Sequence, residues 1–517
     1  MGFRQDNFVI VQNDLAKAID VDDSAGRSVP VNMNFVEEGY LTKDTGSALF
    51  GVETSTQCHS LFHYKKKDGT SHFLRGMGTK LQKYNATTGV WDNLTPTFTA
   101  DKHFGFAVYN DELWGCNGVE NYFKYDGTTF TEYASAPKGN ILEVFEDRMF
   151  VSGVTTGKMG ALTVYYSDIA TPQTFGGTSV LNPLGTDPVM SLKNYYGYLL
   201  IFKQNSIWKM SWYYDSITDT YLPKLEIQSN NYGACSRKAV SWVENDIWFF
   251  TGREVRAIGF KDQQTGVLGV NTSIISNDIK ETLATISTSN YAQVATFYNN
   301  RRFYLAVPIS ANVANTVFVC HTLYGNAWTK YVSRIKASVL DFASIDGVIY
   351  TNKSVTPFGT LKWDETLKAD NGVAIASEVF FKQTEDKDFS KYNLYRYLDL
   401  MFKTLEGRIT LTVKYDAYDL RQTKSKVFYI GQALEDMDAT TGEVPFGQKL
   451  YGNGFGEDVS GAPFEKKRVS MLVKAQTVTL GLANNNLNET FTIAQWALYG
   501  AKQPRRLSKP SSIISLG

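Results

Sequence analysis

Short apolar runs separated by polar turn residues recur along most of the chain. The stretch Phe104–Tyr133 has three such runs, FGFAVY, ELWGCNG and NYFKYDG, which are separated by Asn110-Asp111 and Asn117-Gly118 and closed by Asp126-Gly127. Asn, Asp and Gly are the residues that tight hairpin turns favour. The stretch therefore predicts an antiparallel meander of short strands.

The first strand of this meander is apolar on both sides. Strand alternation places Phe104, Phe106 and Val108 on one face, and Ala107 and Tyr109 on the other. A strand that is apolar on both faces is expected to be covered on both. The pattern therefore predicts sheets that stack against one another.

The same order of strand, turn and strand returns at a steady spacing. Further turns are expected at Asp68-Gly69, Glu146-Asp147, Tyr196-Gly197, Asn245-Asp246, Asn299-Asn300 and Asp346-Gly347. Units begin near residues 56, 104, 141, 189, 239, 293 and 338, roughly forty to fifty residues apart. This spacing is typical of propeller blades, and it predicts a six- to seven-bladed β-propeller over residues 51–370. Trp114 and Cys116 are then expected to pack against the next blade. Two stacked β-sandwiches are the alternative that fits the same turns.

The two ends of the chain have a different character. Residues 1–50 mix turn formers with short apolar stretches, which predicts either an N-terminal arm laid along a neighbouring surface or a frayed lead-in. Longer alternating strands such as RITLTVKYDAYD predict an antiparallel, jelly-roll-like β-sandwich over residues 371–503, with one large acidic and Gly-rich loop inserted at about 431–467. Residues 504–517 are read as a flexible tail or a docking arm.

Composition supports an all-β protein without a charge preference. Aromatic residues make up 14% of the chain and there are 41 Gly, which suits pleated strands and tight turns. Lys+Arg and Asp+Glu both number 52, which gives a formal net charge of zero. The sequence also has no block of basic residues that could neutralise a run of phosphates, so nucleic-acid binding through charge is not predicted. The N-terminus MGFRQDNFVIVQ lacks an apolar signal core, and no later run reaches the length of a membrane span. We therefore expect synthesis in a cytoplasm and no membrane span.

Cysteine and histidine offer few candidates for chemistry. The four cysteines, Cys58, Cys116, Cys235 and Cys320, are far apart and sit in apolar runs, which predicts buried reduced thiols rather than a metal or disulfide framework. His59 and His63 are four apart, but in a strand this spacing separates them by about 13 Å, too far for one metal ion. His72, His103 and His321 have no partner at a useful spacing.

Carboxylates give two further alternatives. Glu435–Glu443, within the acidic stretch 434–443, places oxygens at alternate positions that suit a hard cation, although a solvated acidic loop explains them as well. Propeller glycosidases carry carboxylates near the starts of their innermost strands, and Glu143, Asp187 and Asp341 lie near such starts. Chance carboxylates would also lie there, so we predict no catalytic, cofactor-binding or metal-binding residues and no enzyme activity.

A resemblance covers most of the chain. The run Tyr165–Met210, with YYSDI followed by a Gly- and Asp-containing link and LKNYYGYLLIFKQNSIW, resembles the structural propeller proteins of tailed-bacteriophage tails. Gly252–Leu283, which contains IISNDI, and the lead-in GRSVPVNMNF are similar to further parts of the same pattern. The resemblance implies a virion component: a tail hub, nozzle or stabilising ring, usually six-fold, that extends the portal channel for DNA ejection. It brings no catalytic residues.

Two functions of different class follow. In the first, the chain is a structural ring protein whose partners are copies of itself, forming a homohexamer, together with the neighbouring portal or adaptor and tail proteins. In the second, exposed Trp and Tyr of a propeller rim stack on sugars of a host surface, as a receptor-binding baseplate or tail-tip module. A propeller glycoside hydrolase is a minor third alternative.

Overall fold

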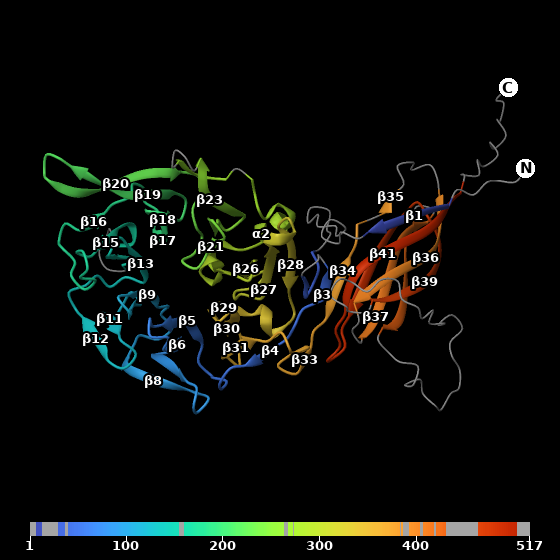
Figure 1. The fold of residues 1–517 in the computed structure, drawn as a ribbon, viewed down its shortest axis with the longest axis horizontal. Coiled ribbons are helices and arrows are strands. Elements are labelled where there is room, and N and C mark those ends of the chain that lie inside the picture. Colours follow the sequence, from blue (N-terminus) through green and yellow to red (C-terminus); the bar gives the residue numbers. More distant parts are fainter. Residues whose placement is uncertain are drawn as a thin grey trace, which may run out of the picture. The chain divides into compact units, whose positions relative to one another are not determined.

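A computed structural model describes residues 7–12, 29–36, 40–154, 160–262, 267–271, 273–382, 384–385, 392–403, 407–417, 420–430 and 464–503. The predicted all-β class is confirmed, because 57% of the chain is strand and 6% is helix. The chain divides into two compact units (Figure 1). Unit 1 comprises residues 1–45 and 367–517, and unit 2 comprises residues 46–366.

Unit 2 contains six four-stranded antiparallel sheets in chain order, followed by four strands of a six-stranded seventh sheet, and we call them sheets 1 to 7. Sheets 1 to 3 contain β5 (Cys58–Lys65), β6 (Ser71–Met77), β7 (Lys80–Asn85), β8 (Val90–Thr97); β9 (Gly105–Tyr109), β10 (Glu112–Cys116), β11 (Tyr122–Tyr125), β12 (Phe130–Tyr133); and β13 (Ile141–Phe145), β14 (Arg148–Ser152), β15 (Val164–Tyr166), β16 (Val180–Leu181). Sheets 4 and 5 contain β17 (Val189–Tyr195), β18 (Tyr198–Lys203), β19 (Ile207–Asp215), β20 (Thr220–Ser229); and β21 (Val240–Val243), β22 (Asp246–Phe250), β23 (Val255–Asp262), β24 (Val267–Val270).

The last two sheets follow the helix α2 (Lys280–Ala284). Sheet 6 contains β25 (Ala295–Asn299), β26 (Arg302–Val307), β27 (Thr316–His321) and β28 (Ala327–Tyr331). Sheet 7 takes three consecutive strands, β29 (Val339–Ile345), β30 (Val348–Lys353) and β31 (Thr360–Trp363), and its fourth is β4 (Ser47–Leu49) from the start of the unit. The seven first strands begin within two residues of the starts expected from the turn spacing.

Apolar layers lie between successive sheets. Leu74 and Phe123 belong to a cluster that joins sheets 1 and 2, and Leu199 and Phe150 belong to one that joins sheets 3 and 4. Similar clusters join sheets 2 and 3, 4 and 5, and 6 and 7, and the first strands of sheets 5 and 6 are in contact. The series returns to its beginning, because Tyr350 of sheet 7 packs with residues of sheet 1. Each sheet is therefore covered on both faces, which explains its apolar strands.

The meander expected at Phe104–Tyr133 is confirmed as sheet 2. Trp114 and Cys116 are buried and pack on sheet 3, as predicted. The first strand does lie between two apolar layers, but Val108 is 38% exposed, so that position does not fit the expected burial. Val108 comes one residue before the strand ends, and the last residue, Tyr109, is buried on the opposite face.

The tight turns after the first strands use residues with positive φ. Asn110 and Asp111 have φ angles of 48° and 63°, and Asp346 is followed by Gly347 in the same region. Two expected turns are wrong by one residue. The turn predicted at Asn245-Asp246 lies at residues 244–245, and the turn predicted at Asn299-Asn300 lies at residues 300–301.

Unit 1 contains two antiparallel sheets. One has the order β2-β3-β41-β36-β39 with β1 on β41, and contains β1 (Asn7–Gln12), β2 (Met33–Phe35), β3 (Leu41–Lys43), β36 (Tyr392–Lys403), β39 (Phe464–Ala475) and β41 (Thr492–Gln503). The other has the order β34-β40-β37-β38 with β35 on β40, and contains β34 (Ser377–Phe380), β35 (Thr384–Glu385), β37 (Gly407–Ala417), β38 (Leu420–Ile430) and β40 (Thr477–Asn484).

The segment expected to form an N-terminal arm supplies strands to both units. β1, β2 and β3 belong to unit 1 and pair within it, whereas β4 completes sheet 7 of unit 2. The side chain of Lys43 is buried and donates hydrogen bonds to Asn484 Oδ1 (2.5 Å) and to the carbonyl of Asn486 (3.2 Å). The inserted loop expected at 431–467 lies outside the described residues up to 463, and its last residues begin β39. The tail 504–517 also lies outside them.

Candidate functional site

Three first strands of unit 2 carry a β-bulge at their second residue. The pairing register of β5 on β6 skips His59, that of β17 on β18 skips Met190, and that of β29 on β30 skips Leu340. A bulged residue drops out of the ladder of backbone hydrogen bonds. The carbonyl groups of His59 and Leu340 are therefore open to other donors.

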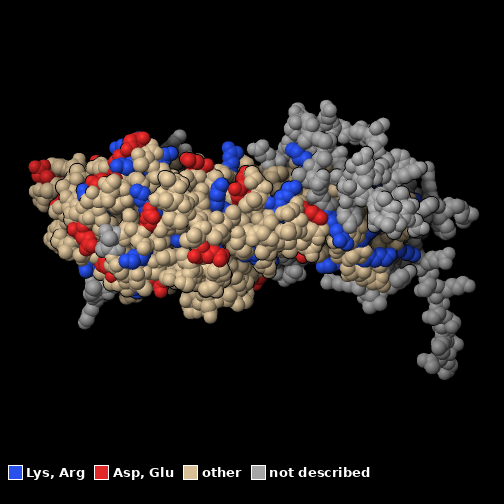
Figure 2. Space-filling view, turned by 90° about the horizontal axis from the view of Figure 1, so that it is seen from below, with Lys and Arg blue, Asp and Glu red and all other residues tan. Residues whose placement is uncertain are grey.

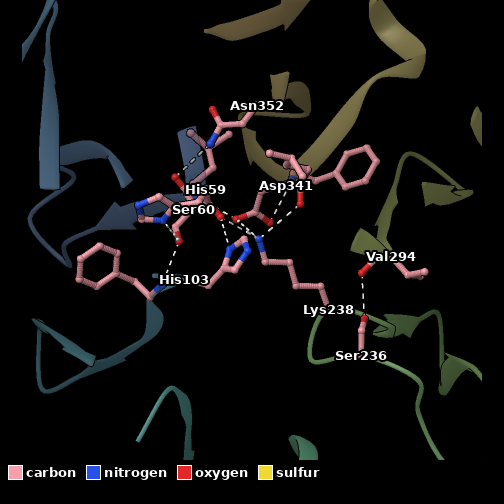
Figure 3. A network of polar contacts seen from close by, with 12 residues as sticks. His59, Ser60, His103, Ser236, Lys238, Val294, Asp341 and Asn352 are labelled. Carbon is pink, nitrogen blue, oxygen red and sulfur yellow. Dashed lines mark hydrogen bonds and ion pairs between the residues drawn. The ribbon is translucent and has the colours of Figure 1, made fainter. Parts of the chain in front are cut away.

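Lys238 donates hydrogen bonds to both of these carbonyl groups. It precedes β21 of sheet 5, and its ammonium lies 3.1 Å from the carbonyl oxygen of His59 and 3.4 Å from that of Leu340. The same Nζ forms an ion pair with Asp341 Oδ2 at 2.9 Å (Figure 3). An ammonium has three donors, and here each has an acceptor. One side chain from sheet 5 thus ties sheet 1 to sheet 7.

The backbone of Lys238 is held by sheet 6. Its carbonyl accepts hydrogen bonds from the backbone N–H (2.7 Å) and the hydroxyl (2.9 Å) of Thr296 in β25. Two residues earlier, the hydroxyl of Ser236 donates to the carbonyl of Val294 at 2.8 Å (Figure 3). The position of the ammonium is therefore fixed by backbone contacts rather than by the side chain alone.

Both carboxylate oxygens of Asp341 accept from donors of the protein. Its Oδ2 accepts from Lys238 and from the backbone N–H of Leu61 at 2.9 Å, and its Oδ1 accepts from the N–H of Phe342 at 3.0 Å. Burial raises the pKa of Asp341 and lowers the pKa of Lys238, while the attraction between the two charges opposes both shifts. Their side chains are 15% and 23% exposed, so water screens the pair only weakly.

Three more polar residues, His59, Ser60 and His103, lie beside this ion pair. We call these three residues, together with Lys238 and Asp341, the first-strand network. His103 Nδ1 hydrogen-bonds the carbonyl of His59, and the two rings lie edge to face. The hydroxyl of Ser60 accepts from the N–H of Phe104 at 2.9 Å, which ties sheet 1 to sheet 2. Burial lowers the pKa of His103 well below its usual range. Both histidines are therefore neutral at physiological pH.

Acid is expected to destabilise the protein through His59. Burial lowers the pKa of His59 from 6.5 to about 4, so the unfolded chain binds a proton at a higher pH than the folded chain. Stability from this group is complete above pH 6.5 and is lost as the pH falls towards 4, which gives a decrease of about 2 kcal/mol in the free energy of unfolding between pH 7.5 and 5. Urea titrations at the two pH values measure the total decrease, to which His103 adds because its pKa is also lowered, and the share of His59 is obtained by comparison with a variant that lacks its ring.

The control for this prediction is His59→Gln, which removes the titrating ring. Its free energy of unfolding should fall by about 2 kcal/mol less than that of the wild type over the same pH interval. An equal pH dependence in the two proteins would show that His59 does not carry the effect.

The three glycosidase candidates have different surroundings in the structure. Glu143 lies in β13 of sheet 3, and burial raises its pKa. Asp187 precedes β17 and holds Lys203 at 3.2 Å and the backbone N–H of Asn205 at 2.9 Å. Within the described part of the chain, no hydrogen bond or ion pair joins either of them to Asp341.

The remaining candidates are placed as follows. His63 bonds the hydroxyl of Ser71 at 2.6 Å, separately from His59. All four cysteines are buried and free, as predicted. Among the described ranges, no group of three or more His, Cys, Asp and Glu is arranged to hold a metal ion. The acidic stretch 434–443 falls outside those ranges.

Neither a scan against protein-family models nor a search of curated proteins finds a match to this chain. No helix in the described segments is both long and apolar enough to cross a membrane. Figure 2 shows Lys and Arg interspersed with Asp and Glu over much of the face that it draws, and several Lys and Arg side by side towards its right. The formal net charge of the whole chain is zero.

Sequence reasoning singled out Asp341 but missed Lys238. The lysine is separated from His59 by 179 residues and from Leu340 by 102. Its role depends on two bulges, and a bulge leaves no fixed residue signature. The only local signal is a Lys directly before an apolar run that begins a strand, which is common in any β protein.

Proposed function

We propose that unit 2 is a seven-bladed β-propeller and that unit 1 is an antiparallel β-sandwich. The seven sheets with apolar layers between them, and the contact of sheet 7 with sheet 1, support the first assignment. The pairing of β4 with β31 supports it further, because a strand from the start of a propeller often completes its last blade. The two sheets of unit 1 support the second assignment.

We further propose that the chain is a structural protein of a phage tail and not an enzyme. The observation that carries this proposal is that both carboxylate oxygens of Asp341 are engaged, by three hydrogen bonds or ion pairs that link sheets 1, 5 and 7. A general acid or base must keep a proton site open to substrate. Charged groups that link sheets in this way stabilise the fold and are not available for catalysis.

The resemblance of Tyr165–Met210 to tail propeller proteins supports a particular assembly, a ring in the virion tail. The chain is proposed to form a hub or nozzle ring of about six copies in the virion tail, extending the portal channel for DNA passage and supporting tail appendages. Portal or adaptor proteins and tail proteins are its proposed neighbours, after synthesis in the host cytoplasm. A net charge of zero suits a ring that lets DNA pass without binding it.

Purified protein is expected to form ring-shaped particles of about six chains. Sedimentation should give a mass about six times the 57.9 kDa of one chain, and negative-stain images should show closed rings. The particle should persist on tenfold dilution, whereas non-specific aggregates would give a broad range of masses. A single chain or a trimer under the same conditions would contradict the ring.

A second candidate function is binding of host glycans. It is favoured by Tyr196 and Trp242, which are 54% and 37% exposed and whose rings lie 5.6 Å apart. Tyr195 stacks on Trp242 from the buried side and fixes its ring. A monomer that binds cells or polysaccharide would support this function in place of the ring.

A further inference from the structure

The hairpin of β19 and β20 extends beyond the rest of sheet 4. β18 pairs with β19 only from Phe202↔Ile207 to Leu199↔Met210. The pairing of β19 with β20 continues for five more residue pairs, from Ser211↔Lys224 to Asp215↔Thr220. We call residues 211–224 the ribbon, and Figure 1 shows it projecting at the end of β19 and β20. Five residues span about 16 Å, and an isolated two-stranded ribbon is only marginally stable in water.

One face of this hairpin is apolar along its whole length. Near its base, Trp208 and Met210 are buried in the cluster between sheets 3 and 4. Side chains of alternate residues point to the same face, so Trp212 and Tyr214 continue this row. Trp212 still contacts sheet 3, because its ring lies 5.4 Å from that of Tyr166. Beyond Trp212, the apolar face continues and its side chains become exposed to solvent.

Two exposed Tyr side chains form the uncovered end of the face, and an exposed Ile lies in the turn beyond them. Tyr214 and Tyr221 are opposite each other in the ladder, with ring centroids 5.5 Å apart, and they are 52% and 68% exposed. Ile217 in the turn is 92% exposed. Monomeric proteins rarely leave such a contiguous apolar patch uncovered unless it binds a partner.

The polar groups of the hairpin already have partners within it. Asp215 accepts from the hydroxyl of Thr218 at 2.7 Å, and the hydroxyl of Tyr214 donates to Asp219. At the base, Glu226 pairs with Lys209 at 2.7 Å and with Lys224 at 2.6 Å. Glu226 is thus paired with two cations, and the carboxylates of Asp215 and Asp219 are engaged by hydroxyl groups of the hairpin itself. The end of the hairpin therefore offers a partner mainly its apolar face, which favours an apolar protein surface over an ionic or hydroxyl-rich one such as a glycan.

We propose that the ribbon is the arm through which one copy of the chain binds the next copy. This inference rests on the proposed ring. A ring closed by rotation needs two different surfaces on each copy, and a projecting apolar arm is suited to be one of them. Tyr214, Ile217 and Tyr221 together expose roughly 400 Å², about half of the roughly 800 Å² that each partner buries in a stable interface.

The test uses the full-length chain and two ribbon variants. The triple variant Tyr214→Ser/Ile217→Ser/Tyr221→Ser removes the apolar end of the face, and the single variant Ile217→Arg places a charge at a side chain that is 92% exposed and so cannot disturb the core. The matched control is Val52→Ser/Leu323→Ser, which removes two apolar side chains of unit 2 that are 51% and 52% exposed but lie outside the ribbon. Mass is measured by sedimentation velocity, and folding by thermal unfolding of the same samples.

The wild type and the control are expected to sediment as rings, and both ribbon variants as single chains with an unfolding temperature within about 2 °C of the wild type. If the ribbon variants remain rings, the ribbon is not the contact and the inference is overturned while the ring stands. If the wild type itself is a single chain, the proposed ring fails first. If a single-chain wild type binds polysaccharide and the ribbon variants do not, the occupant is a glycan, and the inference is again overturned.

Discussion

Deletion of residues 1–45 is expected to abolish the folding of unit 1 and to leave unit 2 folded. β3 pairs with β41, and Val31 exchanges backbone hydrogen bonds of 2.8 and 3.1 Å with Glu378. Met33, Phe35 and Leu41 are at most 1% exposed. Burial of three such side chains contributes about 5 to 9 kcal/mol to the free energy of unfolding, which is comparable with the whole stability of a domain.

Calorimetry of the full-length chain and of the deletion variant measures this effect. The full-length chain should show a transition for each unit, and the variant should keep only the transition of unit 2. The isolated fragment 46–366 is the control, because it should unfold at the same temperature as the transition that remains. A variant that keeps both transitions would show that the N-terminal strands are not required for unit 1 to fold.

Substitution of Lys238 by Met is expected to lower the free energy of unfolding by about 3 kcal/mol or more. The change leaves the buried carboxylate of Asp341 without its counter-charge, and it leaves the carbonyl groups of His59 and Leu340 without their donor. Each orphaned buried acceptor costs about 1 to 3 kcal/mol. Urea unfolding at pH 7.5 measures the loss.

Two further variants separate this effect from the loss of any ion pair. Asp346→Asn removes the exposed pair between Lys65 and Asp346, whose side chains are 58% and 81% exposed, and should cost less than about 1 kcal/mol. The double variant Lys238→Met/Asp341→Leu should lose less than the sum of its single changes, because it removes both buried charges together. Additive losses would contradict coupling between the two residues.

The strands and turns of unit 2 were predictable because their signals are local. A turn such as Asp346-Gly347 needs positive φ, which Asp and Gly tolerate, and the apolar runs on either side fix its position. Where two polar residues in a row suit the turn, as at Asn299-Asn300, local chemistry does not choose between neighbouring registers. The structure places that turn one residue later, with Asn300 and Arg301 at φ angles of 48° and 58°.

The first-strand network was not predictable, because its parts meet only in the folded chain. Asp341 was picked out as a carboxylate near a strand start, but its partner Lys238 comes from another sheet. The membership of β4 in sheet 7 was missed for the same reason, since Ser47–Leu49 is too short to carry a periodic signal and its partner lies more than 300 residues away. Long-range pairing of this kind is decided by the whole fold rather than by the segment.

The pairing of β4 with β31 has a consequence for how the chain is made. A ribosome synthesises Ser47–Leu49 long before it synthesises their pairing partners Leu361–Trp363. At 5 to 20 residues per second, the earlier strand waits for about 15 to 60 s. Throughout this time its backbone donors and acceptors have no partner in sheet 7, and the nascent polypeptide is open to misassociation with other chains on the same message. A chain that terminates early within sheet 7 would keep this edge permanently, so truncated products are expected to aggregate.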